Sequence, residues 1–426
     1  MATNTVHPLS LLSATEIELA TATLRAYMKD TEINFRKLDL QDAPKKELIP
    51  YLEAERLRKP LPTAPSRFVR TLIRRLDTLT FHVASIRLSP PEVVSVEDMP
   101  EHYQPPVDKA ELRQVVSAIL DDPTVNAEIK KLKLPDGFTI SCDPWFSIID
   151  EDTKVGGKRR FQGYMYANAS SHPGSNHYSL PLSVSPILCG DTYKVIGITH
   201  LPLRDSFEGL PTEPWKEVKP VEHDPELVGM PMRTDIKPYI AQQPDGPSFT
   251  VDGNVVEWQK WRFRVGFHSR EGLSLQNVTY DGRNPRAPYA FKQVFDAGDS
   301  GFGYNANQLH LGCDCLGHIH YFDGYTADWE GKPVHHRNMV CLHEQDGGLL
   351  HKMIATLGNY EYIFAYYFDQ AAGIDIEVRA TGILSTCPID NHDGFSYPFG
   401  TNVGPGVFAP NHQHVFSLRV DPAIDG

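Results

Sequence analysis

Cysteine is scarce in this 426-residue chain, with six residues in all, too few for a disulfide scaffold. No run of 18 apolar residues occurs, so we expect no membrane-spanning segment. Basic residues are also in deficit, 41 against 54 acidic ones. The net charge of -13 argues against nucleic acid or an anionic membrane as a partner and mildly favours cationic ligands such as amines.

A secretory signal is not visible either, because Met1 to Pro8 offer no basic segment followed by an apolar one. We therefore expect an intracellular, soluble protein. Apolar residues make up 41% of the chain and charged residues 22%, which is a globular composition. The length predicts two or three domains.

The first half of the chain alternates between helix and strand patterns. Ser13 to Glu16 form a capping box before a helical pattern, and Arg67 to Leu88 read as strands that Pro90-Pro91 ends. A second cap at Asp108 to Glu111 precedes another helix, with strands from Phe138 to about Ile198. We predict two small α+β domains, 1–91 and 92–203, joined by a linker, 204–245, to a third domain.

The remaining segment, 246–426, shows short strands and no convincing amphipathic helix, which predicts an antiparallel β-sandwich and an α+β protein as a whole. The expected strands are Ser248–Val251, Trp258–Gly266, Leu273–Val278, Leu309–Leu311, His318–Phe322, Tyr362–Phe368, Ile374–Ala380 and Val415–Val420.

Three features of this segment could carry chemistry. His412 and His414, expected on one strand, would point to the same face and could bind one copper, zinc, iron or nickel ion, although such pairs also occur without a metal. Tyr360 by itself is an ordinary sheet residue. Asp296 would become a general base if buried beside Phe295 and Phe302. Asp299 looks like a solvated turn residue.

The cysteines carry a weaker signal. Cys313-Asp314-Cys315 lacks a second cysteine pair to complete a zinc site, so buried or free thiols are the simpler interpretation.

Several longer blocks together resemble the copper amine oxidases, and the fungal branch in particular. The resemblance runs in family order from His7-Pro8-Leu9 and Cys142-Asp143-Pro144-Trp145 to the blocks that follow Asp245. These are Trp258 to Phe267, Leu311 to Gly317, Cys341 to Glu344, Thr356 to Tyr362, Thr381 to Thr386 and Asn411 to His414.

This resemblance implies a role for each matching residue. Tyr360, preceded by Asn359 in the cofactor-binding block, matches the tyrosine that becomes topaquinone and forms a Schiff base with the amine; Asp296 matches the proton acceptor. His412 and His414 match two of the family's three copper-binding histidines. The resemblance also implies a Cys315–Cys341 disulfide, and Asp421 matches one ligand of a peripheral calcium or manganese site.

The implied activity is oxidation of primary amines by dioxygen to aldehyde, ammonia and hydrogen peroxide. The resemblance further implies two cystatin-like N-terminal domains, a homodimer and a cytoplasmic or peroxisomal location. We expect the sandwich core to keep the site poor in water.

The sequence departs from the family at three places. It stops at Gly426, before the third copper histidine, and about twenty residues are absent after Arg283 and again after Lys352, roughly a strand pair each. We expect unpaired strand edges at both junctions and weakened copper binding. Skipped exons or a faulty gene model would produce such gaps. Two functions therefore stay open: an amine oxidase, or a catalytically inactive relative that serves as a binding or dimerisation module.

Overall fold

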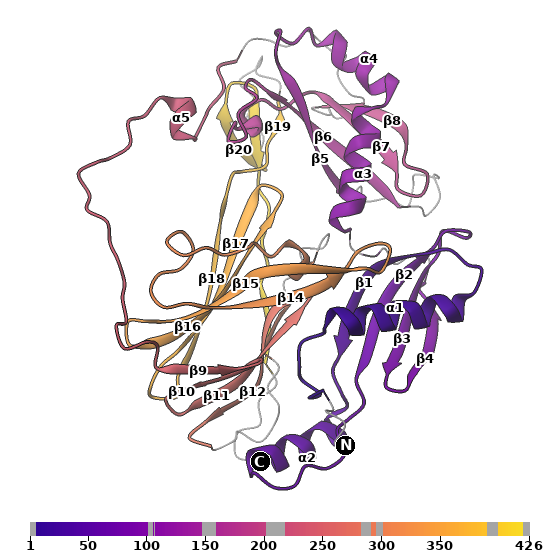
Figure 1. Ribbon diagram of the computed structural model, residues 1–426. Helices are drawn as coiled ribbons and strands as arrows, with labels where there is room; N and C mark the ends of the chain where they lie inside the picture. Colours follow the sequence, from indigo (N-terminus) through magenta and orange to yellow (C-terminus); the bar gives the residue numbers. More distant parts are fainter. Residues whose placement is uncertain are drawn as a thin grey trace.

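The computed structural model consists mostly of antiparallel β-sheets with few helices (Figure 1). None of the helices that it describes is long and apolar enough to cross a membrane. The structure describes residues 6–100, 105, 107–146, 159–201, 218–282, 291–294, 301–389 and 399–420.

The first unit is a four-stranded sheet, in the order β1-β2-β3-β4, with helix α1 packed against it. The predicted capping box starts α1: the Ser13 hydroxyl accepts from the backbone N–H of Glu16, and the Glu16 carboxylate accepts from that of Ser13. The elements are α1 Ala14–Met28, β1 Ile33–Gln41, α2 Lys45–Arg56, β2 Phe68–Arg75, β3 Phe81–Leu88 and β4 Pro91–Asp98.

The prediction for this unit was wrong in two respects. Strand β1 and helix α2 were not predicted. Pro90-Pro91 does not end the sheet, because β4 begins at Pro91 and pairs with β3. Proline is tolerated there since β4 is an edge strand, whose outward N–H groups need no partner in the sheet.

The second unit repeats the arrangement, with helix α3 against a sheet of order β5-β6-β7-β8 (Figure 1). Asp108 caps α3, as predicted, by accepting from the backbone N–H of Glu111. The elements are α3 Lys109–Leu120, α4 Pro123–Lys131, β5 Thr139–Phe146, β6 Arg160–Asn168, η1 His177–Ser179, β7 Val184–Cys189 and β8 Lys194–His200.

The described part of the predicted linker, 218–245, is extended apart from the single turn of helix α5, Pro225–Val228. It leads along one side of the molecule to the third part of the chain (Figure 1).

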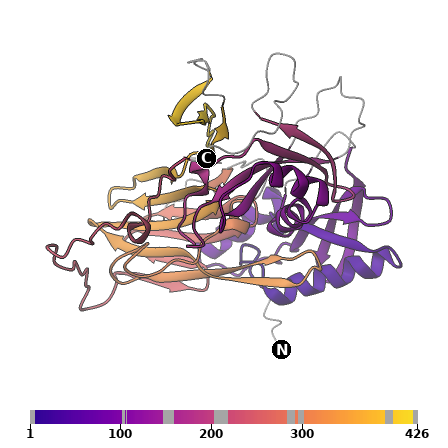
Figure 2. The same cartoon turned by 90° about the horizontal axis from the view of Figure 1, so that it is seen from above.

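This third part contains two large antiparallel sheets, which face each other across a hydrophobic core (Figures 1 and 2). Six strands form one sheet, in the order β22-β13-β12-β11-β10-β9, and β14 to β18 form the other in sequence order; β19-β21-β20 form a small third sheet. Phe263 and Leu275 of the first sheet pack with Phe364 and Phe368 of the second.

The strands of the first large sheet are β9 Phe249–Asp252, β10 Val255–Trp258, β11 Trp261–His268, β12 Gly272–Tyr280, β13 Phe291–Val294 and β22 Ser417–Arg419. Those of the second are β14 His320–Ala327, β15 Pro333–Gln345, β16 Gly348–Leu357, β17 Tyr360–Phe368 and β18 Ile374–Gly382. The small sheet has β19 Cys387–Pro388, β20 Gly400–Gly404 and β21 Val407–Pro410, and a short helix, η2 Gly303–Asn305, precedes β14.

The junction between Lys352 and Met353 does not have the unpaired edges that we expected. It lies inside β16, where Lys352 pairs with Cys341 of β15 on one side and with Ala365 of β17 on the other. A single strand thus closes the sheet across the junction. The junction that follows Arg283 lies outside the described residues.

Candidate functional site

The candidate site begins at the turn between β16 and β17. Leu357 pairs with Tyr360 across the two-residue connection Gly358-Asn359, and Gly358 has a φ of 60°, in the left-handed region that a tight hairpin of this kind requires. Tyr360 is therefore the first residue of β17. Tyr362, two residues on, points to the same face of the strand, with its ring centroid 6.4 Å from that of Tyr360.

His412 and His414 lie opposite these tyrosines. The hydroxyl of Tyr360 is 2.9 Å from Nε2 of His412, and that of Tyr362 is 2.8 Å from Nδ1 of His414. The centroids of the two imidazole rings are 4.7 Å apart. The structure therefore brings the predicted tyrosine and both predicted histidines together.

The strand predicted for these histidines is shorter than expected. Strand β22 contains only Ser417–Arg419, and residues 411–416 have no regular secondary structure. The backbone of residues 411–416 is not part of a β-sheet, and side chains make the contacts to β17. The two rings come together without the strand geometry from which their shared face was predicted.

The orientation of the His412 ring follows from its two partners. Its Nδ1 is 3.1 Å from the carbonyl oxygen of Pro410, which can only accept a hydrogen bond, so Nδ1 carries the proton. In the neutral form of the ring, Nε2 accepts the hydrogen bond of the Tyr360 hydroxyl. For His414, burial followed by the neighbouring His412 lowers the pKa, which favours the neutral imidazole that binds metals.

Ser385 and Tyr362, which we did not predict individually, complete the surroundings of Tyr360. The backbone N–H of Ser385 donates to the Tyr360 hydroxyl over 3.2 Å, and the Asn359 amide donates to the Ser385 hydroxyl over 2.9 Å and to the carbonyl of Ile383. Tyr362 was missed as a partner of His414. Its spacing of two from Tyr360 on a strand was the available signal, and Ser385 lies in one of the matched blocks.

The second small unit reaches this site through the segment that follows Ser385. The Tyr166 hydroxyl donates to the carbonyl of Thr386 over 2.8 Å, and the Thr386 hydroxyl donates to the carbonyl of Tyr178 over 2.5 Å. The Tyr178 hydroxyl in turn donates to Asp143 over 2.7 Å. Burial raises the pKa of both Tyr178 and Asp143.

The imidazole pair suits a transition metal ion, with the Tyr360 hydroxyl beside it. Within the described parts of the chain, no third His, Cys, Asp or Glu joins this pair in a metal-binding group. His412 is exposed and Tyr360 half-buried, so these residues do not show the water-poor surroundings that we expected. Asp296 and Asp421, the predicted base and peripheral metal ligand, lie outside the described residues, as does Asp299.

The predicted disulfide between Cys315 and Cys341 is present. Of the other cysteines, Cys142 and Cys189 are buried, Cys387 is half-buried and Cys313 is exposed.

Comparison with known proteins identifies the family. Residues 250–285 and 283–426 match the model of the copper amine oxidase enzyme domain. The chain is 35% identical to copper amine oxidase 1 of Aspergillus niger over 99% of its own length and 69% of that enzyme. It is 33% identical to the peroxisomal primary amine oxidase of Pichia angusta, over 97% of its own length and 64% of that enzyme.

A solved structure gives the same result. The benzylamine oxidase of Hansenula polymorpha superimposes with a TM-score of 0.91 at 37% identity, covering 99% of this chain and 71% of that one. The alignment with the Aspergillus niger enzyme extends over 474 positions, so that enzyme has residues that this 426-residue chain lacks. The chain spans about two thirds of the length of these relatives. It belongs to the copper amine oxidases, a family of copper-dependent oxidoreductases.

Proposed function

We propose that this chain catalyses the oxidative deamination of primary amines with copper and a topaquinone formed from Tyr360, and that dioxygen is the oxidant. The products would be an aldehyde, ammonia and hydrogen peroxide. One observation carries the proposal: the Tyr360 hydroxyl lies 2.9 Å from Nε2 of His412, and the ring centroids of Tyr360 and His414 are 4.9 Å apart. Family membership favours this function over an inactive module.

His412 and His414 would hold the copper ion. His412 would bind through Nε2, which requires the Tyr360 hydroxyl to give up its hydrogen bond to that atom, and His414 would bind through Nε2 if its Nδ1–H donates to the Tyr362 hydroxyl. This donation would fix both the tautomer and the ring orientation of His414. Copper bound there would activate dioxygen for oxidation of the adjacent tyrosine ring.

The remaining residues would position the tyrosine and move protons. Ser385 and Asn359 hold the Tyr360 hydroxyl and the preceding turn in place. Burial and the neighbouring Tyr360 raise the pKa of Tyr362 to about 12, so its hydroxyl keeps its proton at neutral pH. We propose Asp296 as the base that removes the α-proton of the bound amine.

Other features are proposed on the same basis. They are two cystatin-like N-terminal units, a homodimer, a calcium or manganese site at Asp421, and a peroxisomal location like that named for the Pichia angusta and Nicotiana tabacum relatives.

The test is titration with phenylhydrazine, which forms a coloured hydrazone with a protein quinone. The protein is first loaded with copper in air. We expect one visible-absorbing adduct per chain in the unmodified protein and none in Tyr360→Phe. Tyr367→Phe is the matched control, because Tyr367 lies on the same strand but bonds to Glu377. An absent adduct in copper-loaded, folded protein contradicts the proposal.

A further inference from the structure

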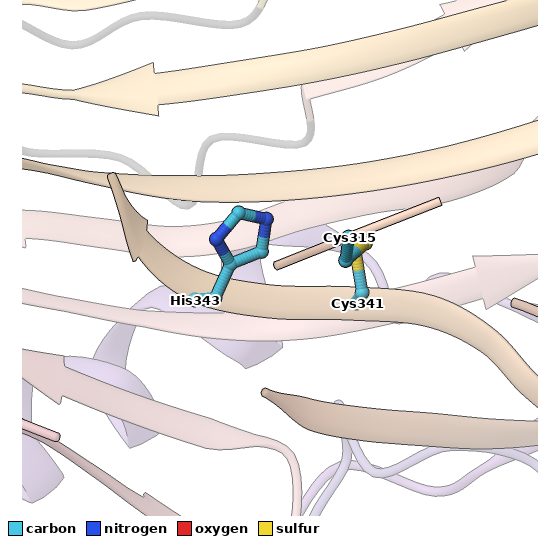
Figure 3. Close-up of side chains that lie close together, drawn as sticks. All are labelled: Cys315, Cys341 and His343. Atoms are coloured by element: carbon cyan, nitrogen blue, oxygen red, sulfur yellow. A yellow bond between two sulfur atoms is a disulfide. The ribbon is translucent and has the colours of Figure 1, made fainter. Parts of the chain in front are cut away.

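A second cluster with metal-binding side chains lies on β15, outside the site described above. Cys315, Cys341 and His343 are 4%, 0% and 2% exposed. One ligand atom from each lies within 4.8 Å of the others. Figure 3 shows the imidazole of His343 beside the disulfide, with Cys341 on the same strand. None of the three takes part in the proposed amine oxidation.

The fold holds these side chains together from two directions. Cys341 and His343 are two residues apart on β15 and therefore share a face. Cys315 comes from the loop before β14, which is closed by a bond of 2.8 Å from the Gly312 N–H to the Cys315 carbonyl. The Lys352 ammonium group donates to the carbonyl of Asp314 and ties this loop to β16.

One nitrogen of the buried His343 imidazole has no hydrogen-bond partner among the described residues. Its Nδ1 is 3.4 Å from the carbonyl oxygen of Glu344, a weak contact in which only Nδ1–H can donate. Nε2 is then left with a lone pair, and it has no hydrogen-bond partner among the described residues. A buried polar atom without a partner destabilises the fold, and a metal ion bound to Nε2 would supply that partner.

A cavity gives access to the cluster. It has a volume of about 610 Å³, and both Cys315 and His343 contribute to its lining. The exposed thiol of Cys313 and the side chains of Asp314 and Lys352 lie along the same cavity. An ion or a small thiol could reach the cluster by this route.

We propose that reduction of the Cys315–Cys341 bridge converts this cluster into a Zn²⁺ site. A dithiol reductant supplies two electrons and two protons; its own sulfurs become a disulfide, and the Cys315–Cys341 bond breaks to give two thiols. Zn²⁺ then binds both sulfurs with release of the two thiol protons, and the Nε2 lone pair of His343 is the third ligand. A water molecule from the cavity fills the fourth position.

The distances and the ligand chemistry agree with this ion. Zinc–sulfur and zinc–nitrogen bonds are about 2.3 and 2.0 Å, so ligand atoms on one zinc ion are at most about 4.6 Å apart. The three ligand atoms already lie within 4.8 Å of one another, close to this span. Two thiolates with one imidazole favour zinc over hard cations such as Mg²⁺ and Ca²⁺.

The experiment uses Co²⁺ as a coloured substitute for Zn²⁺. The full chain is reduced with a phosphine, freed of reductant without air, and titrated with cobalt chloride. We expect thiolate-to-cobalt charge-transfer absorption that saturates at one ion per chain and disappears on addition of Zn²⁺. The oxidised protein should not show this absorption. Because it requires sulfur ligands, binding to His412 and His414 does not produce it.

Variants identify the ligands. His343→Gln keeps the disulfide, so the oxidised protein folds as before, and in the reduced state it should bind Co²⁺ about 100-fold more weakly. Cys341→Ser should abolish the charge-transfer band. Cys313→Ser, which removes the neighbouring exposed thiol, is the matched control and should bind like the unmodified chain. The proposal is wrong if reduction unfolds the protein, if no band forms, or if His343→Gln leaves the affinity unchanged.

Discussion

Two parts of the molecule bury ionisable side chains completely. In one the buried group has charged partners, and in the other it has none among the described residues. Where the two small units meet, Glu111 of α3 lies between Arg36 of β1 and Arg159, and all three side chains are at most 1% exposed. In the sandwich core, His351 of β16 is equally buried, but neither of its ring nitrogens has a hydrogen-bond partner among the described residues. Phe263 and Phe322 pack edge-on against it.

The comparison shows how a buried ionisable group is tolerated. The carboxylate of Glu111 is fully paired: Arg159 donates to it twice, over 2.8 and 2.6 Å, and Arg36 donates as well. His351 instead stays neutral: burial, followed by the nearby His320, lowers its pKa to about 3. The ion pairs of Glu111 connect the two small units. His351, in contrast, places polar nitrogens in an apolar core and so lowers the stability of the fold.

The candidate site lies between these extremes. His412 and His414 are not fully buried, and each has a tyrosine hydroxyl as its partner. The contact between Tyr362 and Nδ1 of His414 orients that imidazole and leaves its Nε2 for a metal ion, whereas a metal ion on Nε2 of His412 would replace the hydrogen bond to Tyr360.

The largest loss of stability should come from removing the charge of Glu111, which pairs with two arginines. Glu111→Gln leaves the guanidinium groups of Arg36 and Arg159 buried without their shared carboxylate, and we expect a loss of about 3–5 kcal/mol in stability. Urea unfolding at neutral pH measures it. Glu128→Gln is the matched control: this partly exposed carboxylate pairs with Lys131, which is 57% exposed, and with His200, so its loss should cost less than about 1 kcal/mol. Equal losses in the two variants would contradict the contrast between buried and exposed pairs.

A smaller effect, on metal affinity, is expected at the candidate site. Tyr362→Phe removes the hydroxyl that lies 2.8 Å from Nδ1 of His414 while it keeps the ring in the core. Removing such an outer partner costs about 10- to 100-fold in metal affinity, or roughly 1.4–2.7 kcal/mol. Isothermal titration with Cu²⁺ measures the change. Tyr367→Phe serves again as the control on the same strand, and an unchanged affinity in Tyr362→Phe would show that His414 needs no partner.

The elements that could be predicted from sequence are those whose burial follows a simple pattern. The aromatic-rich strand β17 and the capped helices α1 and α3 were predicted to within a few residues. Strand β1 was missed because it buries Arg36 and Asp39, whose partners Glu111 and Ser269 are remote in sequence. Charged residues look like surface residues until such partners are known.

The candidate site was predicted by family resemblance rather than by local pattern. Tyr360 and His412 are 52 residues apart, and a hydrogen bond over that separation has no signature in spacing or periodicity. The alternating apolar residues after His414 do form a strand, but only over Ser417–Arg419, so the strand expected to include both histidines begins later than predicted.

The effect of the unpaired His351 should appear most clearly in the pH dependence of stability. Unfolded His351 binds its proton near 6.5 and folded His351 only near 3, so between these values the unfolded state holds more protons. This residue therefore lowers stability by about 1.4 kcal/mol for each pH unit below 6.5. His351→Leu removes that dependence, and it should stabilise the fold by about 1 kcal/mol at pH 7, because the unsatisfied nitrogens are gone. Unfolding midpoints in urea, compared between about pH 7 and pH 5, test both effects. If the leucine variant shows the same slope as the unmodified protein, a different group carries the acid sensitivity and His351 has a partner in solution.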